Sequence, residues 1–306
     1  MNEPRIKLSI VVGVQHAQEN IPHIMRALTP ALHPEVEFLF CYTAADPDVP
    51  ALVEAQGHIR MIPCPAGSLI PHLWRDGILA ASGERVATTT AHCIPAAGWV
   101  EALIAADLDN AALGGTIENE SNADANACAI FLLRYSAFAP PEAKREVREL
   151  AADNAVYRRS DLLRHKDLLQ RGFWEPSFHS RFRDEGIRLA LDPTLRVIHR
   201  NRYSAREFIA QRFAHGREFG LTRACTQSFL QRLLLVFLAP GIFPVLINRI
   251  VRASRQKPQL RKQLNSAWIW LAVFTLAWAA GETSGYIASL RYRLAAPRRK
   301  GEPFRC

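Results

Sequence analysis

Short apolar runs alternate with helix-like spacing over the first 106 residues. Residues 7–14 (KLSIVVGV) are almost continuously apolar and β-branched, which is typical of a strand covered on both faces. Residues 69–81 instead place apolar side chains at helical intervals, and Gly83 follows as a stop signal. The alternation predicts βαβ units and a mostly parallel sheet. The expected strands are 7–14, 36–42, 58–63 and 85–89, and the expected helices are 22–32, 50–56, 69–81 and 96–106.

The pattern is less regular between residues 107 and 200. Asn and Ala dominate residues 118–129, and two consecutive prolines precede a charged segment. Here we expect a helix near 142–152, a strand at 153–158, a helix at 160–170, a helix ending near Glu185 and a last strand near 196–199.

The chain changes character after residue 220. Residues 233–247 and 265–281 are two runs without a charge, and two prolines and a glycine interrupt the first run. Each is at the short end of the roughly 20 residues that a helix needs to cross a bilayer. The sequence therefore predicts an α/β domain at 1–220 and membrane-associated helices with a basic tail at 221–306.

The positive charge of the chain belongs to the same C-terminal segment. The chain has a formal net charge of +9, but residues 221–306 hold 14 Lys/Arg against two acids, a net of +12. Residues 1–220 are slightly acidic, with 24 basic against 27 acidic side chains. Basic residues among apolar runs fit an anionic membrane surface better than a nucleic acid, and no recognition motif for DNA or RNA accompanies them.

The same charges constrain how the apolar runs meet a membrane. Six basic residues and no acid separate the two runs, and another basic stretch follows the second. If both runs crossed the bilayer, the connecting loop would lie opposite the tail, against the positive-inside rule. We therefore expect a re-entrant or in-plane pair of helices at the cytoplasmic face of the inner membrane. The alternative is a pair of buried helices in a soluble protein.

An ordered series of segments resembles the family 2 glycosyltransferases, whose fold is called GT-A. The segments are LSIVVGV (8–14) with Glu19, GILAASGERV (77–86), IPAAGWVEAL (94–103), DNAVYRRSDLL (153–163), GFWEPSFHSRFRDEGIRL (172–189) and DPTLRVIH (192–199). The resemblance spans roughly residues 7–200 and lies in the order of these pieces, since no single piece is specific. It implies an α/β, Rossmann-like GT-A domain, to which the C-terminal hydrophobic helices are added.

The resemblance implies a function as well as a fold. It implies the inverting transfer of a sugar from a nucleotide-diphosphate donor to an acceptor hydroxyl. The apolar segment would hold the site near the lipid headgroups, which favours a lipid-linked or polysaccharide acceptor at the membrane. The alternative is a catalytically inactive relative that serves as a binding or scaffold subunit in polysaccharide assembly.

The resemblance places the nucleotide at the carboxyl ends of the first two strands. Backbone around Gly13 would face the base, and Asp46 would contact the base or ribose. Each acid also has a simpler explanation, since Asp46 precedes a proline as a turn residue does, and Glu19 suits a helix N-terminus. The residues assigned to this side are Val12, Gly13, Val14, Glu19 and Asp46.

The sequence departs from the family at the end of the fourth strand. Family members hold Mg²⁺ or Mn²⁺ there with an Asp-x-Asp cluster, because hard cations prefer carboxylate oxygens. Residues 88–93 are TTTAHC, with no carboxylate, so Thr90 and His92 are the candidates. Four explanations stay open. His92 ligates a weakly held metal; the metal is absent and Arg75, His72 or His92 meets the diphosphate; catalysis is lost; or His92 only fastens the loop.

The acceptor side keeps an acid. Counted back from Gly186, Glu175 falls on the residue that the family uses as general base, and a carboxylate at a helix start can take the acceptor proton. The alternative for Glu175 is an ordinary first-turn acid, since a proline follows it. Trp174 would stack on a sugar face, and His179 shares a helix face with Glu175. The predicted acceptor-binding residues are Asp153, Asn154, Trp174 and His179.

Overall fold

The protein consists of two compact units. The structure is a computed structural model that describes residues 5–28, 34–53, 59–140, 143–225 and 227–291. Unit 1 comprises Met1–Ala123 and Phe138–Arg202, and unit 2 comprises Asp124–Ala137 and Tyr203–Cys306. The boundary expected after residue 220 stays a prediction about domains.

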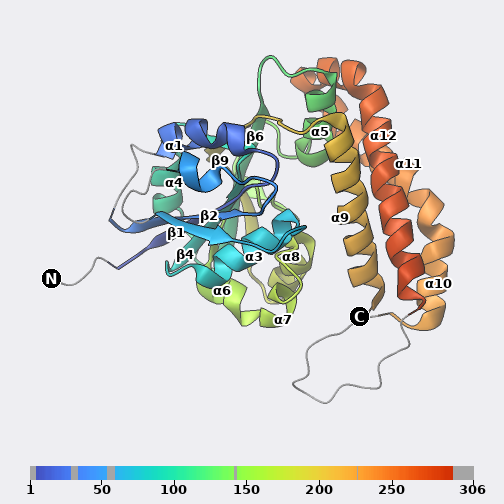
Figure 1. Ribbon diagram of the computed structural model, residues 1–306, viewed down its shortest axis with the longest axis horizontal. Helices are drawn as coiled ribbons and strands as arrows, with labels where there is room; N and C mark the ends of the chain where they lie inside the picture. The colour runs from blue at the N-terminus through green and yellow to red at the C-terminus, as the bar shows by residue number, and fades with distance from the viewer. Residues whose placement is uncertain (1–4, 29–33, 54–58, 141–142, 226, 292–306) are drawn as a thin grey trace. The chain divides into compact units, whose positions relative to one another are not determined.

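Unit 1 is built on a mixed sheet, which has nine strands within the described residues (Figure 1). The strand order is β3-β2-β1-β4-β8-β6-β9-β5, and β7 pairs with β9. β1 pairs in parallel with β2 and β4, whereas β8 runs antiparallel to both of its neighbours, β4 and β6. The strands are β1 (Leu8–Gly13), β2 (Val36–Tyr42), β3 (Ile59–Pro63), β4 (Arg85–Thr90), β5 (Cys93–Pro95), β6 (Ala111–Asn119), β7 (Arg145–Glu146), β8 (Asn154–Arg158) and β9 (Arg188–His199).

Helices cover both faces of this sheet. Figure 1 shows α1 and α4 on one side, and α3, α6 and α8 on the other. Gly77 lets α3 approach the sheet closely, because a Cβ there would lie 2.2 Å from a methyl carbon of Val11. The helical elements are η1 (Gln18–Asn20), α1 (Ile21–Leu28), α2 (Val49–Leu52), α3 (Ile70–Ala80), α4 (Trp99–Ala105), α6 (Arg159–Arg164), α7 (Lys166–Leu169) and α8 (Glu175–Asp184).

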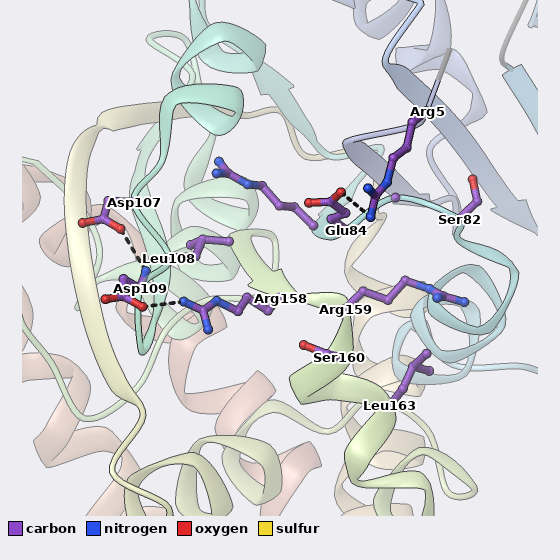
Figure 2. Close-up of a pocket in the computed structure, with 12 residues that line it drawn as sticks. Arg5, Ser82, Glu84, Asp107, Leu108, Asp109, Arg158, Arg159, Ser160 and Leu163 are labelled. Atoms are coloured by element: carbon purple, nitrogen blue, oxygen red, sulfur yellow. Dashed lines mark hydrogen bonds and ion pairs between the residues drawn. The ribbon is translucent and has the colours of Figure 1, made fainter. Parts of the chain in front are cut away.

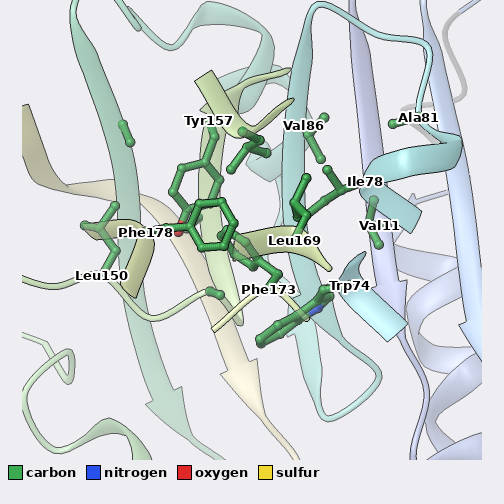
Figure 3. Packing of buried hydrophobic residues seen from close by; sticks show 14 of the residues in the cluster. Val11, Trp74, Ile78, Ala81, Val86, Leu150, Tyr157, Leu169, Phe173 and Phe178 are labelled. Carbon is green, nitrogen blue, oxygen red and sulfur yellow. The ribbon is translucent and has the colours of Figure 1, made fainter. Parts of the chain in front are cut away.

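The core beneath α3 and α8 is aromatic. Trp74, Tyr157, Phe173 and Phe178 pack together there, as Figure 3 shows. The ring centroids of Phe173 and Phe178 lie 4.7 Å apart, within the range of favourable aromatic pairs. This packing fixes the start of α8 against α3 and against the sheet.

The expected strands and helices of the first 106 residues are confirmed where the structure describes them. Parts of the expected helices at 22–32 and 50–56, the first residue of the strand expected at 58–63 and the basic tail after residue 291 lie outside the described residues. The helix expected near 142–152 is wrong, because the described part of that segment pairs through β7 with β9 instead. The sequence prediction also missed β5, β6 and the helices Ala125–Tyr135 and Ala205–Cys225, and the last strand is longer than expected.

Unit 2 is helical. Its elements are α5 (Ala125–Tyr135), α9 (Ala205–Cys225), α10 (Phe229–Leu238), η3 (Ala239–Gly241), α11 (Ile242–Arg255) and α12 (Pro258–Ser289). Two described segments, Phe229–Arg255 and Pro258–Ser289, are long and apolar enough to cross a membrane by length and composition. The most apolar stretch of the first is only 11% buried, against 39% for the second.

Glycines bring α9 and α12 into close backbone contact. A Cβ on Gly220 would lie 2.3 Å from the Glu282 carbonyl oxygen, and one on Gly281 would lie 2.1 Å from the Phe213 carbonyl oxygen. Gly216 and Gly285 make equally close contacts, so each helix contributes a pair of glycines four residues apart. Such small-xxx-small pairs allow helix backbones to approach. The sequence prediction did not include this contact.

Candidate active site

The carboxyl ends of β1, β2 and β4 meet at one edge of the sheet. Gly13 lies in register between Cys41 of β2 and Thr90 of β4. Val14 N–H extends this pairing by donating to the Cys41 carbonyl at 2.8 Å. Val12 and Val14 are fully buried and Gly13 is buried as well, so the contact of residues 12–14 with a nucleotide stays a prediction.

Asp46 holds the loop that follows β1. Its buried carboxylate accepts backbone N–H groups from His16 at 2.9 Å, Ala17 at 3.0 Å and Gln18 at 3.2 Å. Such charge-assisted bonds are stronger than neutral ones. The structure thus gives Asp46 a loop-fastening role, and its contact with a base or ribose stays a prediction.

Asn20 joins three segments at this edge, and the sequence prediction missed it. Its fully buried side chain donates to the Ala91 carbonyl at 3.0 Å and to the Arg200 carbonyl at 3.1 Å. It also accepts from Arg202 Nε at 3.0 Å. Glu19, the neighbouring site candidate, is 79% exposed and lies 3.8 Å from Arg202 Nε. The β1 loop, the β4 loop and the segment after β9 therefore form one connected surface.

His92 is held between two backbone carbonyls. Nε2 lies 3.0 Å from the Gln15 carbonyl oxygen, and Nδ1 lies 3.2 Å from the Arg200 carbonyl oxygen. A metal ligand needs a ring nitrogen lone pair aimed at the ion, and here both nitrogens face acceptors. Within the residues that the structure describes, no three His, Cys, Asp or Glu side chains gather to hold a metal ion. These residues do not fit a Mg²⁺ or Mn²⁺ held by the protein, and the predicted metal role of His92 finds no support in this geometry.

A carboxylate nevertheless lies at the end of β4. Thr90 Oγ1 donates to Asp153 Oδ1 at 2.9 Å, and Thr89 Oγ1 donates to the Asp153 carbonyl at 2.9 Å. Asp153 is 5% exposed. The cause is the antiparallel insertion of β8, which begins where β4 ends, with Thr89 opposite Asn154. Asp153, which the sequence analysis assigned to the acceptor side, thus places a carboxylate next to residues 88–93, which have none themselves.

Asn154 has a structural role in this arrangement. Its side-chain amide donates to the Thr116 and Leu195 carbonyls, each at 3.0 Å, and accepts from Trp99 Nε1 at 2.8 Å. The side chain is fully buried. It therefore links β6, β9 and α4, and its contact with an acceptor stays a prediction.

Glu175 and Trp174 form the start of α8. Glu175 is the first helical residue and is half-buried, with a proline next to it in the first turn. Phe173 N–H donates to the Pro71 carbonyl at 2.7 Å, and the Trp174 ring lies edge-on to His72 with centroids 6.5 Å apart. The N-terminal turns of α3 and α8 are therefore adjacent, and Trp174 and Glu175 lie beside them.

A buried phenol, Tyr157, lies within the electrostatic influence of Glu175 and Asp153. Burial raises the pKa of Tyr157 well above its ordinary value, and the charges of Glu175, Glu149 and Asp153 add to that rise. Tyr157 therefore stays protonated. Its hydroxyl lies 3.1 Å from His179 Nε2.

His179 lies inside the core rather than beside a ligand. Its ring is fully buried, and Nδ1 lies 3.2 Å from Glu149 Oε2. Burial lowers the pKa of His179, and Glu149 partly opposes that effect. His179 therefore faces the core from α8, and its contact with an acceptor stays a prediction.

The basic side chains proposed from the sequence for the diphosphate have local partners. Arg75 Nε lies 2.8 Å from Asp76 Oδ1, and His72 Nδ1 accepts from Leu69 N–H at 3.1 Å. Arg200 and Arg202, which the sequence prediction missed, instead contact the residues around His92. The sequence could have indicated them, since they directly follow the strand expected at 196–199, whose end lies at the same edge of the sheet.

A cavity of about 630 Å³ lies at the opposite edge of the sheet. Arg5, Glu84 and Arg158 line it, and the ion pairs Arg5–Glu84 at 2.8 Å and Arg158–Asp109 at 2.9 Å are drawn in Figure 2. None of the predicted site residues borders it. Ligands of open α/β sheets bind at the carboxyl ends of the parallel strands, so we place the candidate site there.

Known proteins share the fold rather than the sequence. No family model and no curated protein matches this chain. Among solved structures, the mannosyltransferase PcManGT from Pyrobaculum calidifontis, in complex with GDP-Man and Mn²⁺, is 14% identical with a TM-score of 0.51, over 90% of this chain and 86% of that chain. This similarity confirms the expected fold, a mixed α/β domain of the GT-A type.

Two other solved structures are more distant. GalNAc-T7 with UDP, GalNAc and Mn²⁺ is 12% identical with a TM-score of 0.48, over 66% of this chain. The present chain spans 45% of the length of that protein. A mycobacterial protein is 15% identical with a TM-score of 0.46, over 69% of this chain and 73% of that chain.

Proposed function

We propose that this protein is an inverting family 2 glycosyltransferase that uses a nucleotide-diphosphate sugar. The main support is the arrangement at one sheet edge of the Gly13 backbone, the Asp153 carboxylate bound to Thr90, and Glu175 at the start of α8. The shared fold with a structure that holds GDP-Man is consistent with such a donor. The fold alone hosts several functions, so the proposal depends on these residues.

Glu175 is the proposed general base. Its carboxylate takes the proton of the acceptor hydroxyl as that oxygen forms a bond to the anomeric carbon of the donor. The bond between the anomeric carbon and the diphosphate oxygen breaks at the same time. The products are a glycoside of inverted configuration and a nucleoside diphosphate. Tyr157 does not compete for the proton, because its raised pKa keeps it protonated.

The substitution Glu175→Gln tests this role. General base catalysis contributes about 10²- to 10⁴-fold, so turnover should fall by at least about 10²-fold. The affinity for nucleoside diphosphates should not change. Asp184→Asn, which removes an exposed carboxylate from the other end of α8, is the matched control and should keep full turnover. Unchanged turnover in Glu175→Gln would overturn the assignment.

A catalytically inactive scaffold for polysaccharide assembly is the second candidate. The lack of a carboxylate in residues 88–93 and the fastening of His92 between two carbonyls favour it. Binding of a nucleotide sugar by the wild-type protein without any release of nucleoside diphosphate would support the scaffold over the enzyme.

We also propose that unit 2 attaches the protein to the cytoplasmic face of the inner membrane, where the acceptor is lipid-linked or a growing glycan. α9 exposes Arg206, Glu207 and Arg217 and packs closely along the C-terminal half of α12. Charged side chains are costly in hydrocarbon, so this half of α12 should lie outside the bilayer core. Leu230 and Phe237, which are 77% and 73% exposed, can instead enter one leaflet.

A further inference from the structure

The segment after β9 runs beside the loop that follows β4. β9 pairs antiparallel with β5, with His199 opposite Cys93. Arg200 N–H extends this ladder by donating to the His92 carbonyl at 2.7 Å. Residues 200–202 therefore lie at the carboxyl edge of the sheet, next to the strand end where the donor diphosphate is expected.

Buried hydrogen bonds hold this segment in place. Asn20 accepts from Arg202 Nε and donates to the Arg200 carbonyl, and its side chain is fully buried. A second donor bond from Asn20 reaches the Ala91 carbonyl. A flexible side chain loses entropy when it binds a ligand, and the bond to Asn20 reduces that cost for Arg202.

The positive charge at this place is only loosely neutralised. Arg200 Nε lies 3.4 Å from Glu120 Oε2, and Arg202 Nε lies 3.8 Å from Glu19 Oε2. The arginine side chains are 27% and 26% exposed, whereas Glu19 is 79% exposed. Glu120 is 26% exposed, so the Arg200–Glu120 pair is partly buried, whereas Arg202 pairs with an exposed carboxylate, and an incoming anion can displace such a weak pair.

The positive charge of these arginines affects His23, a residue of α1. Burial lowers the pKa of His23, and the charges of Arg200, Arg26 and Arg202 lower it further. Three guanidinium groups therefore act on one ring at this edge. Basic side chains are concentrated at this edge, whereas the described residues contain no group of three or more side chains that could hold a metal ion.

We propose that Arg200 and Arg202 bind the diphosphate of the nucleotide donor and that they supply the positive charge that a protein-held metal would otherwise provide. Guanidinium groups present paired N–H donors that match phosphate oxygens. When the bond to the anomeric carbon breaks, negative charge grows on the departing diphosphate, and the two arginines stabilise it. The inference rests on the proposed function for the identity of the donor, but phosphate recognition can be tested separately.

Titration calorimetry in EDTA tests this assignment with inorganic pyrophosphate, with UDP and GDP, and with uridine and guanosine. The variants Arg200→Gln and Arg202→Gln should each weaken pyrophosphate and nucleoside diphosphate binding by about tenfold or more. Affinity for the nucleosides should stay the same. Arg188→Gln, at the opposite end of β9 and 59% exposed, is the matched control. Thermal unfolding verifies that each variant is folded, and Arg200→Gln leaves the bond to Asn20 intact.

The outcomes separate the two proposals. Binding of pyrophosphate in EDTA that depends on both arginines supports the phosphate site, even if no donor is turned over and the proposed enzyme function fails. Binding that requires Mn²⁺ would overturn the inference. Equal affinity of the wild-type protein and both variants, or no affinity of the wild-type protein for any phosphate probe, would overturn it as well.

Discussion

The substitution Asn20→Ala should destabilise unit 1 strongly, because Asn20 connects three segments from inside the protein. It removes two bonds to backbone carbonyls and one from the Arg202 guanidinium. Neutral bonds contribute about 1 kcal/mol each and a bond to a charged group about 1.5–3 kcal/mol. The Arg200 carbonyl oxygen still has His92 Nδ1 at 3.2 Å, so the lost hydrogen bonds that matter most are those to the Ala91 carbonyl and from Arg202. The expected cost is about 2.5–4 kcal/mol.

Thermal unfolding followed by circular dichroism measures this cost. For a unit of this size, 1 kcal/mol shifts the midpoint by about 2–4 °C, so the unfolding transition of unit 1 should fall by about 5–16 °C. Gln18→Ala is the matched control, since it removes a side-chain amide of the same loop that bonds Asp48 at the surface. It should change stability by less than about 0.5 kcal/mol. If Asn20→Ala stays within about 1 kcal/mol of the wild type, Asn20 does not hold these loops together.

Three further predictions concern stability at low pH, the contact between α9 and α12, and attachment to a membrane. Burial raises the pKa of Glu37, but bonds from Ser9, Ser82 and Arg60 outweigh it, and the net pKa is lowered from 4.5. The stabilisation by ionised Glu37 is thus complete above pH 4.5 and is lost as the pH falls through the lower folded-state pKa. In Glu37→Gln the unfolding midpoint should therefore fall less steeply than in the wild type as the pH is lowered. An equally steep fall in both proteins would refute this. Gly220→Leu should destabilise unit 2 by about 1–3 kcal/mol in thermal unfolding, because a Cβ would lie 2.3 Å from a carbonyl oxygen, whereas Gly241→Ala meets open space and should be neutral. The wild-type protein should float with anionic vesicles, and the substitutions Leu230→Glu and Phe237→Glu should weaken this flotation. Recovery of the wild-type protein in the soluble fraction at low salt would contradict membrane attachment.

The regular part of unit 1 was predictable because parallel strands covered on both faces are continuous apolar runs. β1 (LSIVVG) follows that rule. β6 (Ala111–Asn119) does not, since it contains two glycines and small residues that obscure its period. The structure explains one of them: a Cβ on Gly115 would lie 1.8 Å from the Leu195 carbonyl oxygen. The composition that conceals this strand is required by the close approach of β9.

The site was harder to predict because its contacts join distant residues. Thr90 and Asp153 are 63 positions apart, and only the antiparallel insertion of β8 brings them together. Asn20 and Arg202 are 182 positions apart. The sequence alone showed an absent acid at residues 88–93 but could not show that Asp153 lies against them.

Release of nucleoside diphosphate from a panel of nucleotide sugars tests the central claim most directly. The assay compares the wild-type protein with Glu175→Gln, on anionic vesicles that carry a lipid-linked glycan with free hydroxyl groups as the acceptor, in EDTA and in Mn²⁺. We predict that at least one donor is consumed in EDTA by the wild type and at least about 10²-fold more slowly by the variant. The account is contradicted if no donor is consumed faster by the wild type than by Glu175→Gln under either condition.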